Sequence, residues 1–315
     1  MDYDDFLLNE IVQWDIGKFN LIFKNPIIFL CGGDVEPISK PEARVYTSLR
    51  SYLIDYSSHI KAQIRTAELF KDYSFYYDDL LEFECDIASI SDLVVIILEG
   101  PGALIELGLF SVKPDIFEKL VVIQHNDFSS ELSFANLGPL QALKNSKENS
   151  VLDYNWPLNQ EFSILKDGVL KVIGQDISAH LKSIRTQSKF NINIDAHFIL
   201  FIYEIIRCFF PMTEKEILDA LQLLDFDRKF SLKQVKKIVY LLCSFELVNK
   251  YKVSNITFIY PLEQSVSKVK LTYTQEREDQ KKLIFDYLRL RVGILPSIKL
   301  DDKRTLALQD IKELS

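Results

Sequence analysis

Two carboxylates flank a glycine turn in the stretch VVIILEGPGALIELGLF, residues 94–110. Glu99 ends one apolar run, and Glu106 stands in a second apolar run that follows the turn. Glu106 lies about one turn into a predicted helix, from which its side chain can point back at the strand end. A desolvated carboxylate there can stabilise or trap the oxocarbenium ion formed when a glycosidic bond breaks. The alternative is a surface glutamate near a helix start, which the helix dipole favours.

Glycine turns follow two of the predicted strands. Gly32 and Gly33 close the run PIIFLCGG, and Gly100, Pro101 and Gly102 follow the next apolar strand. Ligands of open α/β sheets bind beyond the carboxyl ends of the strands, where glycine lets the backbone approach and a helix N-terminus faces phosphate. Neither turn is a GxGxxG or a GxxxxGK[ST] motif, which disfavours a dehydrogenase or a phosphate-transfer site. We expect a nucleotide pocket at these turns, the alternative being two ordinary tight turns.

The elements that position these residues alternate between strand and helix. Residues 26–33, 92–99 and 119–127 are continuous apolar runs, typical of strands buried on both faces of a parallel sheet. Helices are expected at 75–89 and from Ala103 onward. Strands joined through helices make right-handed crossovers. The sequence therefore predicts an α/β fold with a doubly wound, flavodoxin- or Rossmann-like parallel sheet.

The second half of the chain is mainly helical. Helices are expected at 195–210, at 211–226 and within 231–252, which runs into a two-stranded ribbon completed by 255–262. Three helices followed by a ribbon is the order of a winged helix-turn-helix. The window 226–270 holds nine Lys/Arg against three Asp/Glu, whereas the whole chain has a net charge of -8. We expect a smaller winged-helix domain with a basic surface.

The domain prediction has three parts: an α/β domain 1–190, a winged-helix domain 191–270 and a helical tail 271–315. Six residues are predicted to contact nucleic acid or a partner: Lys233, Gln234, Lys236 and Lys237 on the third helix, and Lys250 and Lys252 in the wing. Such lysines bind phosphate through charge and specify little sequence. The alternative is a solvated basic face on a packing domain, since many winged helices bind proteins.

Composition excludes several classes of protein. A net charge of -8 argues against a protein that coats nucleic acid indiscriminately. The four histidines do not cluster, so no metal site is expected. No apolar run approaches the ~18 residues of a membrane span, and the acidic start is unlike a signal peptide, so we expect a cytoplasmic protein without membrane contact. The cysteines lack CxxC spacing and are read as free thiols of a reducing compartment: Cys31, Cys85, Cys208 and Cys243.

The motif order resembles that of the nucleoside deoxyribosyltransferase-like enzymes over residues 25–127, where CGG precedes CDIASISDLVVIILEGPGALIELGLF. The resemblance implies that Glu106 is the catalytic glutamate, that Asp86 is a substrate-contacting aspartate, and that Gly32 and Gly33 form the first pocket loop. With a winged helix behind it, the chain is similar to the nucleoside deoxyribosyltransferase-like effectors of type II retrons. That similarity implies an antiphage toxin that associates with a reverse transcriptase and msDNA, an RNA-linked single-stranded DNA, as a homo-oligomer or higher assembly.

One position departs from the transferase pattern. The transferases place a second aspartate six residues before the glutamate, where this chain has Gly100. Glu99 could substitute for it at a different spacing, so a role of Glu99 as the proton donor stays open. A departing purine or pyrimidine needs a proton donor. Nicotinamide leaves the pyridinium of NAD as a neutral molecule and needs none. We therefore predict an N-glycosidase that uses NAD as its substrate, without a cofactor, and that contacts it through the turn Glu99 to Gly102.

Two alternatives stay open. One is a non-catalytic, nucleotide-sensing DNA-binding regulator. The other is a deoxyribosyltransferase or N-glycosidase that acts on deoxynucleotides or nucleic acid bases. A sensor would tolerate glutamine in place of Glu106, whereas an enzyme would not.

Overall fold

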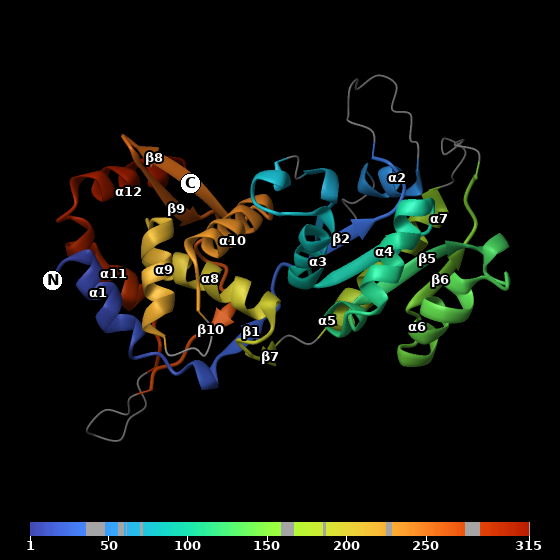
Figure 1. The fold of residues 1–315 in the computed structure, drawn as a ribbon, viewed down its shortest axis with the longest axis horizontal. Helices are drawn as coiled ribbons and strands as arrows, with labels where there is room; N and C mark the ends of the chain where they lie inside the picture. The colour runs from blue at the N-terminus through green and yellow to red at the C-terminus, as the bar shows by residue number, and fades with distance from the viewer. Residues whose placement is uncertain are drawn as a thin grey trace. The chain divides into compact units, whose positions relative to one another are not determined.

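The computed structural model places the chain in two compact units, and most of their helices and strands are labelled in Figure 1. Unit 1 comprises Met1–Lys24, Asp72–Asp79 and Arg185–Ser315, and unit 2 comprises Asn25–Lys71 and Leu80–Ile184. The units are therefore interleaved along the chain. The structure describes residues 1–35, 48–55, 60, 62–69, 72–158, 167–184, 187–224, 229–274 and 284–314.

Unit 2 is built on a five-stranded sheet in which all paired strands are parallel. The strands are β2 (Ile27–Cys31), β3 (Gln63–Arg65), β4 (Leu93–Ile97), β5 (Leu120–His125) and β6 (Val151–Tyr154). Every residue of β2, β4 and β5 is buried, as apolar runs covered on both faces require. The strand order β3-β2-β4-β5-β6 confirms the predicted doubly wound α/β fold. The order reverses between β2 and β4, the switch point at which such sheets bind ligands.

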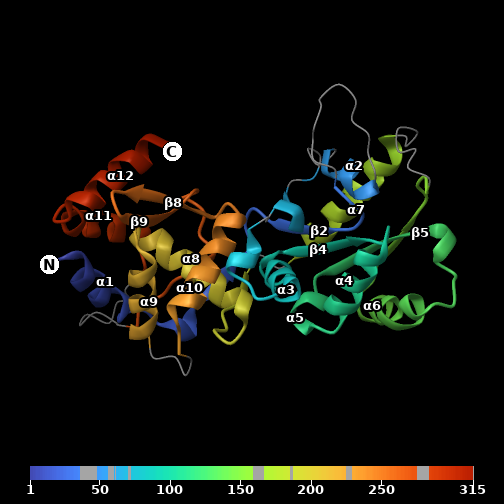
Figure 2. The same cartoon turned by 45° about the horizontal axis from the view of Figure 1, so that its top comes forward.

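Helices cover both faces of this sheet. Figure 2 shows α2 and α7 on one side and α3, α4 and α5 on the other. Ile28 and Leu30 of β2 belong to the core that α2 and α7 complete. Phe29, between them, faces the other way, with its ring centroid 6.3 Å from that of Phe110 in α4. The helices are α2 (Leu49–Asp55), α3 (Leu80–Ile90), α4 (Pro101–Ser111), α5 (Pro114–Phe117), α6 (Gln141–Ser146) and α7 (Asp167–Ser183).

Unit 1 combines helices with two small sheets. Strand β1 pairs antiparallel with both β7 and β10, and β8 pairs antiparallel with β9. Helices α8, α9 and α10 precede the β8–β9 ribbon in the predicted order. The bounds are α1 (Tyr3–Ile11), β1 (Asn20–Ile22), β7 (Gln187–Lys189), α8 (Asp195–Phe209), α9 (Glu214–Leu223), α10 (Leu232–Ser244), β8 (Val248–Val253), β9 (Ile256–Pro261), β10 (Val269–Lys270), α11 (Tyr287–Ile298) and α12 (Asp302–Leu314).

The units are interleaved, whereas the domains expected from the sequence were contiguous. Residues 1–190 were expected to form one domain, but Met1–Lys24 lies in unit 1 because β1 is the central strand of its three-stranded sheet. The capping boxes Thr213–Glu216 and Ser231–Gln234 start α9 and α10, which explains where these helices begin. Among the described helices, none is long and apolar enough to cross a bilayer.

One helix prediction needs correction at its start. The helix expected at 75–89 begins at Leu80, because the preceding segment Asp72–Asp79 packs with unit 1 and contains only a short 3-10 turn, η4 (Tyr73–Phe75). Residues 275–283 of the predicted helical tail 271–315 lie outside the described part of the chain. The described tail contains α11, which starts at Tyr287, and α12.

Candidate functional site

Glu106 lies on the face of α4 that is turned toward the end of β2. Its carboxylate interacts with the thiol of Cys31, the last residue of β2, and with Glu84 of α3 and Arg50 of α2. Its Oε2 atom is buried and has no hydrogen-bond partner among the described residues. Buried polar atoms are normally hydrogen-bonded, so a stabilising role in the fold does not explain why a glutamate stands here.

The surroundings of Glu106 favour its neutral form. Burial raises the pKa of this carboxyl from its usual 4.5 to about 7, and the neighbouring Glu84 carboxylate adds to the rise. The positive charge of Arg50 and the hydrogen bond to Cys31 act in the opposite direction. Near neutral pH the group therefore exists in both protonation states, as suits a residue that acts in acid–base or nucleophilic chemistry.

Arg50 ties the elements around Glu106 together. Its side chain is almost fully buried and donates hydrogen bonds to the carbonyl oxygens of Leu30 (3.0 Å) and Gly33 (3.1 Å). It also makes two bonds to the carboxylate of Glu68, at 2.8 and 2.7 Å. Burial acts to raise the pKa of Glu68, but these bonds and the charge of Arg50 lower it overall. The guanidinium thus holds the end of β2 and neutralises one nearby acid.

Glu99 has a different role from that expected of a pocket acid. Its carboxylate accepts hydrogen bonds from the backbone N–H groups of Gly33 (3.1 Å), Arg50 (3.2 Å) and Leu49. Burial raises the pKa of Glu99, while these three bonds oppose the rise. A carboxylate that already accepts three N–H bonds joins the β4 end to the start of α2. The proton-donor role that the sequence left open for Glu99 has little support from this geometry.

The two glycine turns also differ. Gly32 has a φ of +155°, and a Cβ atom on it would lie 3.2 Å from side-chain carbons of Arg50 and Ile97. A Cβ on Gly33 would lie 2.7 Å from that of Ser48. Packing within unit 2 therefore requires both glycines. By contrast, nothing lies within 4 Å of a Cβ on Gly100 or on Gly102, so the second turn leaves its surface open.

The carboxylate of α3 that acts most strongly on Glu106 is Glu84, whereas the sequence singled out Asp86. Residues two apart on a helix point in different directions, so Glu84 and Asp86 project from different faces of α3. Asp86 instead acts on the thiol of Cys85, whose pKa burial raises. Burial also raises the pKa of Glu84, and Glu68 adds to that rise.

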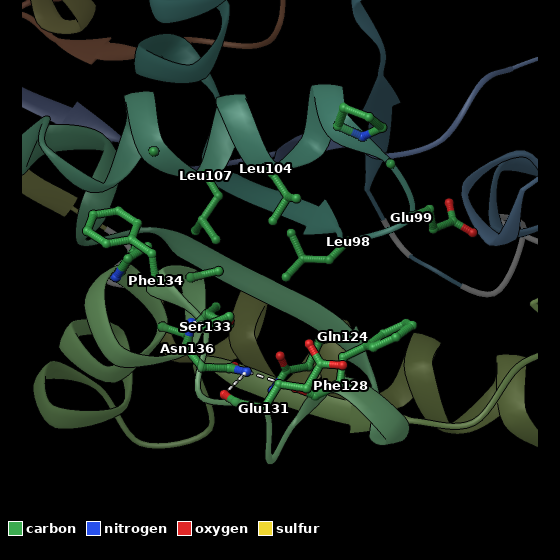
Figure 3. A pocket seen from close by; sticks show the side chains of 16 residues that line it. Leu98, Glu99, Leu104, Leu107, Gln124, Phe128, Glu131, Ser133, Phe134 and Asn136 are labelled. Carbon is green, nitrogen blue, oxygen red and sulfur yellow. Dashed lines mark hydrogen bonds between the residues drawn. The ribbon is translucent and has the colours of Figure 1, made fainter.

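A separate pocket of about 640 Å³ lies on another face of α4. Figure 3 shows Leu98, Leu104 and Leu107 on one side of it and the segment with Phe128 and Phe134 on the other. This segment runs from η5 (Asn126–Phe128) to η6 (Asn136–Leu140). The amide of Asn136 holds it by donating to the carbonyl oxygens of Phe128 (2.8 Å) and Glu131 (2.9 Å).

Three of the predicted substrate-binding residues line this pocket: Glu99, Gly100 and Pro101. The Glu99 carboxylate points away from the leucines that line it (Figure 3). Glu106 and Gly102 are not among the lining residues. The structure therefore places the predicted site residues on two faces of α4. Glu106 and the residues around it, which we call the Glu106 cluster (Cys31, Arg50, Glu68 and Glu84), lie by β2. The apolar pocket lies by β5.

The basic face of α10, defined as Lys233, Lys236 and Lys237, is partly occupied by the chain itself. Lys233 forms an ion pair with Asp78 at 3.4 Å, and the Nζ of Lys237 lies 4.4 Å from the ring centroid of Tyr77. Lys236 is exposed.

The other predicted contacts have mixed surroundings. Lys250 of β8 pairs with Glu214 at 3.0 Å, and the Gln234 side chain accepts the N–H of Ser231 in the α10 capping box. Lys252 is exposed. The six residues therefore do not form one continuous free surface.

The sequence missed Cys31, Arg50, Glu68 and Glu84 as parts of the Glu106 cluster. The only local signal was the position of Cys31 directly before a glycine turn at a strand end. Among the described residues, no group of three or more His, Cys, Asp or Glu side chains is arranged to hold a metal ion.

Comparison with known proteins gives a family model and two relatives. The model, described as "STM3845 retron effector protein", matches residues 46–250. The chain is 26% identical over 213 residues to the "Retron Ec73 putative ribosyltransferase/DNA-binding protein" of Escherichia coli, covering 62% of this chain and 65% of that protein. It is 26% identical over 289 residues to the "Retron Ec86 putative ribosyltransferase/DNA-binding protein" of the same organism, covering 84% and 83%. The chain thus spans slightly less than two thirds of the Ec73 protein.

Proposed function

The chain belongs to the STM3845 retron effector family, and we propose that it is an N-glycosidase that hydrolyses the bond between nicotinamide and ribose in NAD. The observation that carries this proposal is Glu106. It is a partly buried carboxylate beside the switch point of a doubly wound sheet, its Oε2 atom is buried without a hydrogen-bond partner among the described residues, and its pKa is raised to about 7. The names of the two relatives, which contain "ribosyltransferase", support chemistry at a ribose carbon.

In the proposed reaction, the bond between the ribose anomeric carbon and the pyridinium nitrogen breaks. Both electrons go to the nitrogen, so nicotinamide leaves neutral and the ribose becomes an oxocarbenium ion. The ionised Glu106 carboxylate stabilises this cation or bonds to it, and water then adds and loses a proton. The cationic substrate favours ionisation of Glu106, so binding and activation occur together.

The raised pKa also supports one competing substrate class. A protonated Glu106 can donate its proton to a departing purine or pyrimidine, as an enzyme acting on deoxynucleotides needs. The two readings require opposite protonation states of the same carboxyl. NAD cleavage needs the carboxylate, whereas base release from a deoxynucleoside by proton donation needs the acid.

The pocket by β5 suits a heterocycle or an apolar ligand group. Its volume of about 640 Å³ falls within the range usual for small-molecule sites. Gly100 and Pro101 at its edge stay proposed substrate contacts. Gly102 is also a proposed substrate contact, because its surface is open. Gly32, Gly33 and Asp86 are proposed as substrate contacts from the family resemblance.

Unit 1 is proposed to act as a winged-helix module that binds nucleic acid. The helix order and the β8–β9 ribbon support this, as does "DNA-binding" in the relatives' names. In this proposal the effector acts as a toxin in antiphage defence and is restrained by a reverse transcriptase and its msDNA in a larger assembly. No membrane contact is expected.

A substrate panel tests the enzymatic proposal. The purified chain is incubated with NAD, nucleosides and deoxynucleotides, and the released base is separated and measured. We expect nicotinamide from NAD, and a loss of about 10³-fold or more in Glu106→Gln, because the charge acts mainly in the transition state. Base release from deoxynucleotides alone would change the substrate. Undiminished release by Glu106→Gln would remove the catalytic assignment.

A further inference from the structure

An exposed aromatic ring lies beside the basic face of α10. Phe75, in η4, is 82% exposed, which is unusual for a ring of that size in a packed segment. It lines a pocket of about 300 Å³ together with Tyr76, Leu232, Lys233 and Lys236. The pocket therefore has an aromatic wall and two ammonium groups.

The segment that carries Phe75 is anchored from behind. Tyr76 stacks on Tyr240 of α10, with ring centroids 4.3 Å apart and an interplanar angle of 14°. Tyr77 is buried and packs edge-on against the same Tyr240. These contacts hold the two residues that directly follow the exposed ring. Phe75 is thus presented on a supported segment, so a ligand that stacks on it need not order a loose loop first.

The two lysines that line this pocket differ in how far their charges are compensated. Asp78 is paired with Lys233, so that pair contributes little net charge. Asp72 and Asp79 lie in the same segment, and Lys237 lies over the ring of Tyr77. Lys236 lines the pocket and is exposed. A ligand that offers one aromatic face and one phosphate fits this arrangement better than a long polyanion does.

We propose that Phe75, with Lys236 and Lys233, forms a binding site for an unpaired nucleotide of single-stranded nucleic acid. The base stacks on the Phe75 ring, and the adjoining phosphate contacts Lys236. A base within a duplex has no free face for Phe75, so the site selects single strands. The inference rests on the proposed nucleic-acid role of unit 1 and adds to it a defined ligand and the residue that selects it.

The test is a fluorescence anisotropy titration of the full chain with a labelled single-stranded DNA of about 12 nucleotides and with a matched duplex. We expect Phe75→Ala to weaken single-strand binding roughly tenfold or more, because stacking on one ring contributes on that order. Phe75→Trp keeps the affinity, and duplex binding changes little in either variant. The control is Leu132→Ala, which removes an apolar side chain that is 89% exposed in unit 2 and lines neither pocket, and it is expected to leave both DNA affinities unchanged.

The outcomes separate this site from the rest of the account. Equal single-strand affinity of Phe75→Ala and the unmodified chain overturns the site, even if unit 1 binds DNA elsewhere. Equal losses in Phe75→Ala and Phe75→Trp, or equal losses on single strand and duplex, also overturn it. If the unmodified chain binds neither DNA, the nucleic-acid role and this site fail together. Base release from NAD, measured on the same samples, shows independently whether the enzymatic proposal holds.

Discussion

The sequence predicts functional sites both at Glu106 and on the basic face of α10, yet the surroundings of these two sites in the structure differ. Glu106 is partly buried, its Oε2 atom is buried without a hydrogen-bond partner among the described residues, and its pKa is raised. On α10, Lys233 pairs with Asp78, and Lys237 lies over the ring of Tyr77. A charge in a largely desolvated site is costly and persists where function selects it, whereas an exposed ion pair changes stability little. The comparison makes Glu106 the stronger functional candidate.

The largest expected effect on stability comes from Glu106→Gln. Ionising this partly buried carboxyl destabilises the folded state, because its folded pKa of about 7 lies above the usual 4.5. The stability of the unmodified chain should therefore fall as pH rises from about 4.5 to 7, and the variant should escape that loss. At pH 8 the variant should be more stable by up to about 3 kcal/mol, and at pH 4.5 the two should be nearly equal.

Urea denaturation of both proteins across this pH range measures the difference. A constant stability difference at all pH values would show that Glu106 titrates normally, and the contrast with the lysines of α10 would disappear. A variant that is less stable at pH 8 would show that the glutamate makes structural bonds that outweigh its burial.

A smaller effect is expected from the neighbouring acids of α3. Glu84→Gln removes a negative charge that raises the pKa of Glu106. The rise of kcat/KM for NAD with pH should then move to lower pH. At pH 6, kcat/KM expressed as a fraction of its plateau value should be severalfold higher in the variant, since each pH unit of displacement changes this fraction by up to tenfold. Asp86→Asn is the matched control on the same helix. It should leave the position of the rise unchanged, even if it raises KM. An equal displacement by both variants would contradict the assignment of Glu84 to the cluster.

The smallest effect is expected on the basic face. Lys236→Ala should weaken single-strand binding and flatten its log–log salt dependence by about 0.7. Lys233→Ala should change the slope less, because Asp78 already compensates that charge. Binding titrations at several salt concentrations compare the two variants. Equal changes in slope would mean that the ion pair opens when nucleic acid binds. No change in either would indicate that this face contacts protein or solvent only.

The parts of the fold that sequence predicted are those with strong local patterns. The strands β2, β4 and β5 are continuous apolar runs, and α8, α9 and α10 fall within the ranges where helices were expected. Glu106 was found because a carboxylate in an apolar helix start is conspicuous. These features depend on neighbours in the chain, so one sequence is enough to find them.

The parts that sequence did not predict depend on contacts between distant segments. Arg50, Glu68 and Glu84 come from separate elements and gather around Glu106 only after the sheet has formed. The same reason explains why the helix of α3 starts later than its pattern suggested. The residues before it pack on α10 through Tyr76 and Tyr240, and that packing replaces a helical turn.

The central claim is that Glu106 acts as a carboxylate in cleaving NAD, and the pH dependence of kcat/KM for nicotinamide release tests it most directly. This ratio reports the protonation state of the free enzyme. The account predicts that kcat/KM rises through about pH 7 to a plateau and that Glu106→Gln shows neither the activity nor the rise. A kcat/KM that instead falls above pH 7 would show that the protonated acid is the active form, and would contradict the account.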